Sequence, residues 1–178
     1  MNNFVLEIWY DEGSACTFYT VKWGDGTDET VSETDKFFDT YAVPGHELEE
    51  KAMQLFRLIT ESIGNRYGAI DDFFDREERA AQALPPRPKR RVEAIMQLGL
   101  HFPLRLYCYR VNEQVVVLFN GGVKDADTAQ ASKGLGIKFY EAQHFVQRLE
   151  SALREKTIWV SDNERYLEGE EGINNIQF

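Results

Sequence analysis

Basic and aromatic side chains gather in the middle of the chain, in a pattern that could hold and cut a phosphate ester. They are Lys89, Arg90, Arg91, His101, Arg105, Tyr107, Tyr109, Arg110 and Lys124. RNA cleavage without a metal needs a base for the 2′-hydroxyl proton, cations that neutralise the phosphorane, and an acid for the leaving oxygen. Arginine binds two phosphate oxygens through its planar fork, and tyrosine can stack on a base or transfer a proton. The candidate catalytic residues are therefore Arg105, Tyr107, Tyr109 and Lys124, and the others are candidate RNA contacts.

The charge distribution directs an anionic ligand to the same segment. The net charge is -10, and an acidic surface repels nucleic acid, which argues against a protein that coats it without specificity. Residues 85–124 nevertheless carry 7 Lys+Arg against 2 Asp+Glu, whereas residues 1–84 carry 7 against 18. We expect phosphate to meet the central segment. The acidic remainder either serves solubility or faces a basic partner.

The central cluster lies on a predicted β-hairpin. Residues 104–111 alternate in character, and successive residues of a strand point to opposite faces. One face would carry Leu104, Leu106 and Cys108, and the other Arg105, Tyr107 and Tyr109. Residues 115–119 form an unbroken apolar run, which predicts a central strand covered on both faces. An alternative without chemistry remains open, because arginine and aromatic side chains also pack well on a half-exposed sheet face.

Strands and helices are both predicted before this hairpin. Phe4–Tyr10 and Cys16–Trp23 are short, aromatic and β-branched, which predicts paired strands. A capping-box-like pattern predicts a short helix over residues 34–41. Apolar residues at helical spacing predict an amphipathic helix from Glu47 to Gly64.

The remaining segments complete the predicted set of elements. We predict a charged helix over residues 70–84, which the prolines that follow would end. The short apolar pattern of residues 90–98 is compatible with a strand or a helix, and we interpret it as a strand. The apolar pattern of Ile137–Lys156 predicts another amphipathic helix, followed by a short strand over residues 157–160. The fold class is therefore α+β, with a curved antiparallel sheet against two or three amphipathic helices. We expect one domain over residues 1–160 and an acidic, flexible tail over residues 161–178.

Motifs for bound metals and cofactors are absent from the sequence. The P-loop, HExxH, paired CxxC and Rossmann glycine patterns do not occur, so we expect neither a metal nor a cofactor. Cys16 and Cys108 lie in apolar, strand-like runs, as buried reduced thiols do. The sequence has no apolar run of about 18 residues and no signal-like start, which predicts a cytoplasmic protein without membrane contact.

The middle and end of the chain resemble a toxin family. The segments RLYCY (residues 105–109) and LFNGGVK (residues 118–124) are similar to the basic strand and the lysine-ended strand of the RelE/ParE toxin superfamily, most closely its phage-derived, HigB-like branch. The similarity covers about residues 90–156. The chain departs from that family in its acidic balance, its added segment over residues 71–91 and its tail.

The resemblance implies a fold and a function. It implies a RelE-like sheet with helices on one side and an open face that meets ribosome-bound mRNA. Arg105 would contact phosphate, Lys124 would match the family's lysine after the sheet turn, and Tyr107 or Tyr109 would stack or transfer a proton. The protein would then be the toxin of a bacterial or phage toxin–antitoxin pair, an mRNA endoribonuclease whose partner is an antitoxin protein.

Other functions are compatible with the same residues. A non-catalytic α+β module could use its acidic helices and tail to bind a basic protein. A phage accessory protein could bind a small anion near Lys124 and the two glycines that precede it. The sequence does not choose among these functions, and it leaves the oligomeric state open.

Overall fold

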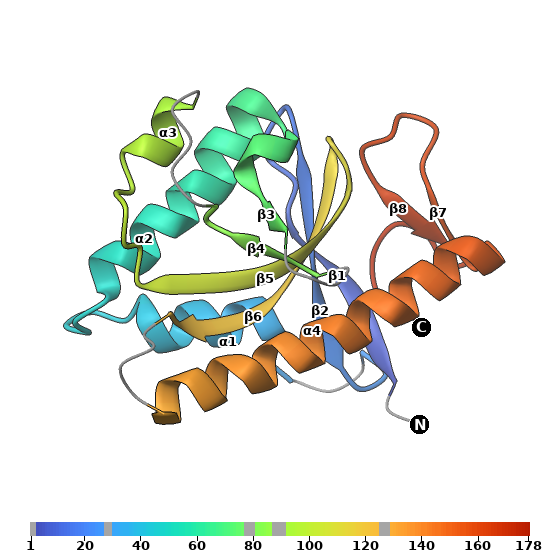
Figure 1. Ribbon diagram of the computed structural model, residues 1–178. Helices are drawn as coiled ribbons and strands as arrows, with labels where there is room; N and C mark the ends of the chain where they lie inside the picture. Colours follow the sequence, from blue (N-terminus) through green and yellow to red (C-terminus); the bar gives the residue numbers. More distant parts are fainter. Residues whose placement is uncertain (1–2, 27–29, 77–80, 87–91, 125–128) are drawn as a thin grey trace.

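A mixed β-sheet of seven strands organises the chain (Figure 1). The computed structural model describes residues 3–26, 30–76, 81–86, 92–124 and 129–178. The strands are β1 (Phe4–Tyr10), β2 (Thr17–Trp23), β3 (Asp75–Arg76), β4 (Gln82–Leu84), β5 (Leu104–Asn112), β6 (Val115–Val123) and β9 (Ile176–Gln177). Their order across the sheet is β3-β4-β5-β6-β2-β1-β9. The β1–β2 pair and the β5–β6 hairpin confirm two predictions from the sequence.

The sheet is mixed, which corrects the prediction of a purely antiparallel sheet. Strands β2 and β6 run parallel, with Thr17 opposite Val115 and Thr20 opposite Leu118. The other neighbouring strands of the sheet pair antiparallel. Parallel strands need a long crossover connection, and here residues 24–114, which include β3, β4 and β5, lie between the two strands in the chain. Local sequence patterns reveal adjacent hairpins but not such a remote pairing.

Helices cover both faces of the sheet (Figure 1). They are α1 (Glu33–Tyr41), α2 (Glu49–Arg57), the π-helix η1 (Leu58–Tyr67), the 3-10 turn η2 (Asp71–Phe73), α3 (Glu93–Met96) and α4 (Ala129–Glu155). A hairpin of β7 (Ile158–Val160) and β8 (Leu167–Gly169) follows α4. Within the described residues, no helix is both long and apolar enough to span a membrane.

Two hydrophobic cores lie back to back across the sheet. The first packs α1, α2, η1 and α3 against one face, which receives Leu106 and Leu118. The second packs α4 and the C-terminal segments against the other face, which receives Tyr107 and Phe119. This alternation is the period-2 pattern of strands buried on both sides, and it confirms the predicted division of β5 residues between two faces. The chain is a single α+β domain.

Local sequence explains where α1 begins. The Ser32 hydroxyl accepts a hydrogen bond from the Asp35 backbone N–H at 3.1 Å, the usual N-cap arrangement. Glu33 and Asp35 place carboxylates in the first turn, where the helix dipole favours them. The predicted helix over residues 34–41 is thereby confirmed.

Two segments differ from the predictions. Residues 70–84 were expected to be helical, but they contain η2 and the short strands β3 and β4. Residues 90–98 were expected to form a strand, but their described part contains α3. Val92, Ile95 and Leu98 are buried at a spacing of three residues, which is a helical and not a strand period.

The segment over residues 161–178 also differs from the expected flexible tail. It supplies β8 and β9, and β9 pairs with β1 at the edge of the main sheet. Leu167 and Ile176 are buried in the second core. Tyr19 accepts a hydrogen bond from the Leu167 N–H at 3.0 Å and donates one to the Ile173 carbonyl at 2.8 Å. These few anchors hold the acidic segment against the domain.

Candidate functional site

Arg105 and Lys124 line the same hollow at one end of the β5–β6 hairpin. Arg105 pairs with Gly122 in the sheet, and the Lys124 backbone N–H donates to the Pro103 carbonyl at 2.6 Å. These contacts place the start of β5 beside the end of β6. The hollow is lined by Pro85, Pro86, Gly99, Leu100, Phe102, Leu104, Arg105 and Lys124. The structure thus brings together two of the four candidate catalytic residues.

Gly121 is the residue that lets the two strands approach here. A Cβ atom at this position would lie 1.8 Å from the Arg105 carbonyl oxygen, which no side chain can tolerate. The pairing register shifts between Leu106 and Cys108 at this point, as it does at a β-bulge. Gly121 therefore allows the close approach of β5 and β6 at the end of the hairpin where Arg105 and Lys124 lie.

The hollow suits contact with one end of an anion. Its volume is about 30 Å³, comparable to the space that one water molecule occupies in the liquid. Two of its lining residues are cationic, Arg105 and Lys124, and the others are proline, glycine, leucine and phenylalanine. Arginine and lysine together complement a phosphate, and arginine can bind two of its oxygens. A backbone phosphate could rest at this rim, but a whole nucleotide could not enter.

Tyr107 and Tyr109 are not among the residues that line this hollow, and α4 packs over both of them. Tyr107 is 3% exposed, and its ring contacts Phe139 of α4 at 5.3 Å between centroids. The Tyr109 hydroxyl donates to Glu150 of α4 at 3.4 Å. Burial, reinforced by the Glu150 carboxylate, raises the pKa of Tyr109 to about 12. The open sheet face implied by the family resemblance is therefore covered by the protein's own helix, and Tyr109 stays protonated at neutral pH.

The other basic candidates do not all converge on Arg105. The Arg110 guanidinium donates to the Ala69 carbonyl and lies 3.9 Å from the Glu113 carboxylate, near the β5–β6 turn at the opposite end of the hairpin. His101 is exposed on the segment that borders the hollow but is not among the lining residues. Lys89, Arg90 and Arg91 lie outside the described residues. Their predicted RNA contacts stay predictions.

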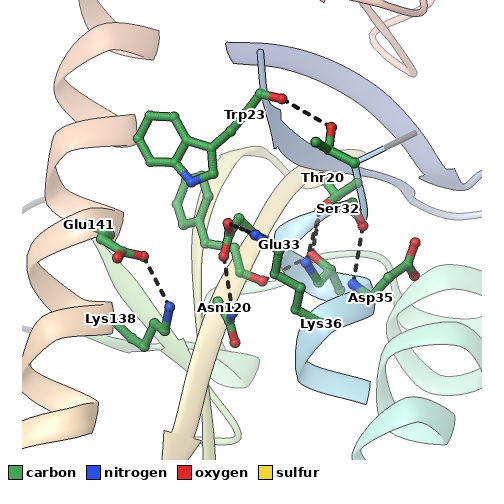
Figure 2. Close-up of polar contacts among 12 residues, drawn as sticks. Thr20, Trp23, Ser32, Glu33, Asp35, Lys36, Asn120, Lys138 and Glu141 are labelled. Atoms are coloured by element: carbon green, nitrogen blue, oxygen red, sulfur yellow. Dashed lines mark hydrogen bonds and ion pairs between the residues drawn. The ribbon is translucent and has the colours of Figure 1, made fainter. Parts of the chain in front are cut away.

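A buried polar cluster holds the strand that carries Lys124 (Figure 2). Glu33 is 2% exposed, and its carboxylate accepts from the Asn120 side-chain amide at 3.0 Å. Lys36 pairs with the other carboxylate oxygen at 2.8 Å. Asn120 in turn accepts from the Gly121 backbone N–H at 2.8 Å. This Glu33–Asn120 cluster links α1 to the glycine end of β6.

Two threonines extend the same link toward β2. The Thr34 hydroxyl donates to the Phe119 carbonyl at 3.0 Å and lies 2.7 Å from the Thr20 hydroxyl. Sequence reasoning missed this cluster because the segment around Glu33 carried only a helix-start pattern. One signal was present. Asn120 directly follows the apolar run of β6 and precedes two glycines. A polar side chain that is buried at such a position needs a hydrogen-bond partner.

The described part of the chain contains no arrangement of residues suited to metal binding or thiol chemistry. No group of three or more His, Cys, Asp or Glu side chains there is placed to hold a metal ion. Cys16 and Cys108 are buried and not bonded to each other. Burial raises the pKa of both thiols, which keeps them in the unreactive protonated form.

Comparisons with known protein families, curated proteins and solved structures find no match for this chain.

Proposed function

We propose that this protein is a RelE/ParE-like toxin component that binds RNA by its phosphate backbone through Arg105 and Lys124. The observation that carries the proposal is that these two cations, from opposite strands of one hairpin, line a single hollow. Arg105 and Lys124 lie in the two segments, RLYCY and LFNGGVK, on which the family resemblance rests. The order of elements also agrees with it: N-terminal strands, a helical pair, the basic hairpin and a long helix.

The proposal is limited to RNA binding by this pair. Hydrolysis needs a base and an acid beside the phosphate, and among the residues that the structure describes, those that line the hollow provide two cations but no carboxylate or histidine. Tyr109 is bonded to Glu150 and keeps its proton at neutral pH. Arg105 and Lys124 therefore contribute charge and position, and an RNA held there would be cut by a group supplied from elsewhere, such as the ribosome.

The acidic surface shapes how the site would act. A net charge of -10 repels long-range approach by RNA, so affinity has to come from a small number of direct phosphate contacts. Each such contact releases counterions and steepens the dependence of the binding constant on salt. An antitoxin would block growth inhibition by covering this end of the hairpin.

The test combines RNA binding with growth. The Kd for a short single-stranded RNA is measured by fluorescence anisotropy at several salt concentrations for the wild-type protein, Arg105→Ala, Lys124→Ala and the double variant. Loss of one phosphate contact should lower the salt slope by about 1. Induced expression should arrest growth, and the double variant should relieve the arrest. Arg154→Ala is the matched control, because Arg154 is exposed near the far end of α4 and donates only to Ser151 among the contacts described for it.

One result would remove the proposal. If the double variant binds RNA and arrests growth as the wild-type protein does, while circular dichroism shows both folded, the hollow has no role in either activity. An equal loss of affinity in Arg154→Ala would also show that the binding reflects surface charge in general.

A second candidate function is a protein-binding module without action on RNA. The observation that favours it is the outer surface of α4, where Ile137 is 50% exposed and Tyr140 is 73% exposed. Large apolar groups on neighbouring turns of a helix are typical of helix-mediated contacts. Retention of a partner that Tyr140→Ser abolishes, with RNA length and growth unchanged, would support this function over the first.

A further inference from the structure

Lys36, Glu33 and Asn120 form an arrangement that is suited to covalent chemistry (Figure 2). The Lys36 Nζ atom lies 2.8 Å from one oxygen of the Glu33 carboxylate. The Asn120 side-chain amide donates to the other oxygen of that carboxylate at 3.0 Å. A single carboxylate therefore contacts both an amine, which is a nucleophile, and the nitrogen of a carboxamide, which is a leaving group once it is protonated.

The fold fixes the carboxylate and the amide, while the amine can move. Glu33 is 2% exposed and Asn120 is 8% exposed. The Thr34 hydroxyl donates to the Phe119 carbonyl at 3.0 Å, which holds the first turn of α1 against the strand residue that precedes Asn120. The Lys36 side chain is 45% exposed, and the flexible stem of a lysine lets its amine change position. The Lys36 amine can therefore leave the carboxylate oxygen and approach the amide carbon of Asn120.

The amide oxygen of Asn120 has a donor of its own. The Gly121 backbone N–H donates to Asn120 Oδ1 at 2.8 Å. This oxygen gains negative charge when a nucleophile adds to the amide carbon, and a backbone N–H that is already in place stabilises that charge. Because Asn120 is buried, water has little access to the same carbon, which disfavours hydrolysis. The three parts of an acyl transfer, namely nucleophile, proton carrier and oxyanion donor, are thus present around one amide.

We propose that Lys36 and Asn120 join in an isopeptide bond, with Glu33 as the proton carrier. Glu33 takes a proton from the Lys36 ammonium, the neutral amine adds to the amide carbon of Asn120, and the protonated Glu33 donates to the amide nitrogen. That nitrogen leaves as ammonia. The proton that the new amide nitrogen then loses passes through Glu33 to the ammonia, which becomes ammonium. One C–N bond forms and one breaks, nothing is oxidised or reduced, and Glu33 is a carboxylate again.

Proximity makes this reaction feasible inside the folded protein. A free amine and a carboxamide react slowly in water, but well-oriented groups in one molecule reach effective concentrations of about 10⁵–10⁸ M. The bond would tie α1 covalently to β6, at the strand end that leads to Lys124. The inference depends neither on RNA binding nor on the RelE/ParE resemblance.

The experiment follows the bond by mass spectrometry. The intact mass of the full chain is measured at purification and during incubation at pH 8, and each molecule that reacts should lose the mass of one ammonia. Trypsin cuts after lysine, so it should no longer cut after Lys36 in the product. The peptide that contains Lys36 should then be found joined to the peptide that contains Asn120. Lys36→Arg keeps the positive charge without the nucleophilic amine and should abolish the joined peptide.

Two further variants test the proton carrier and the specificity. Glu33→Gln keeps the side-chain shape but cannot carry the proton, so the joined peptide should form at least about a hundredfold more slowly. Lys138→Arg is the matched control, because Lys138 lies three residues from Glu141 in α4 and contacts its carboxylate at 3.4 Å. This control should react as the wild-type protein does. Circular dichroism establishes that each variant is folded, and the wild-type peptide map gives a result even if Glu33→Gln does not fold.

Ammonia loss has a competing source, which the same experiment identifies. Attack by the Gly121 backbone nitrogen on the amide carbon of Asn120 would also release ammonia. It would leave trypsin cutting after Lys36 and would continue in Lys36→Arg, and this result overturns the proposal. An unchanged intact mass together with normal cutting after Lys36 in the folded wild-type protein also overturns it, and so does a joined peptide that forms equally fast in folded Glu33→Gln.

Discussion

The Asn120 side-chain amide donates a hydrogen bond of 3.0 Å to the buried carboxylate of Glu33, which joins β6 to the first turn of α1 (Figure 2). Asn120 also accepts from the N–H of Gly121, the residue whose missing side chain allows β5 and β6 to approach. Helix α1 and the hairpin end are therefore coupled through one amide. Glu33 and Asn120 are not among the lining residues of the hollow, but their bond holds the end of β6 that leads to Lys124.

The first prediction concerns the stability that this bond provides. Asn120→Ala should lower the free energy of unfolding by about 2 kcal/mol, because it leaves a buried carboxylate without one of its donors. Lys36→Ala should cost less, since the Lys36 side chain is 45% exposed and half-solvated ion pairs contribute little. Urea denaturation at pH 7 measures both values. A larger loss for Lys36→Ala would mean that the ion pair, and not the amide, stabilises Glu33.

The second prediction compares two glycines. Gly121→Ala should lower stability by several kcal/mol or prevent folding, because its Cβ would overlap the Arg105 carbonyl oxygen. Gly134→Ala should raise stability by about 0.5–1 kcal/mol, since no atom outside the helix backbone lies within 4 Å of its Cβ position in α4 and alanine favours helices. Thermal denaturation of both variants provides the comparison. A tolerated alanine at position 121 would contradict the close strand approach.

Whether a contact of this fold could be predicted depends on how far apart in the sequence its two residues lie. The β1–β2 pair, the β5–β6 hairpin and the amphipathic character of α2 and α4 follow from periodicity and turn residues, because each pattern is local. The division of β5 residues between two faces was also correct. The same local rules place Arg105 and Lys124 at one end of the hairpin, where both line the hollow.

The parts that were missed depend on remote contacts. Nothing near Tyr107 in the sequence indicates that α4 covers it, since Phe139 lies more than 30 residues later. The pairing of β9 with β1 joins the two ends of the described chain. The short strands β3 and β4 carry a charged sequence with a helical pattern, but sheet pairing outweighed that propensity.

The third prediction concerns stability at alkaline pH. The pKa of Cys16 is raised from 9.0 to about 12, and burial also raises the pKa of Cys108. Above pH 9 the unfolded chain loses thiol protons that the folded protein keeps, so the unfolded state is favoured. Their contribution to stability is therefore complete below pH 9 and is lost as the pH rises toward 12. The melting temperature should fall between pH 9 and 11, and Cys108→Ala should reduce the slope of that fall. An unchanged slope would show that other groups dominate.

The last prediction separates the tyrosines from the basic pair. Tyr109→Phe should change the free energy of unfolding by less than about 1 kcal/mol, because its bond to Glu150 is long at 3.4 Å and partly exposed. Since this hydroxyl is bonded to α4 and Tyr109 does not line the hollow, the variant should bind RNA and affect growth as the wild-type protein does. Arg105→Ala, tested beside it, should lose RNA affinity while keeping its fold. Anisotropy with the same RNA measures both variants. A loss of growth inhibition in Tyr109→Phe with RNA affinity intact would instead give the phenol a role in the chemistry and require α4 to move from the sheet during the reaction.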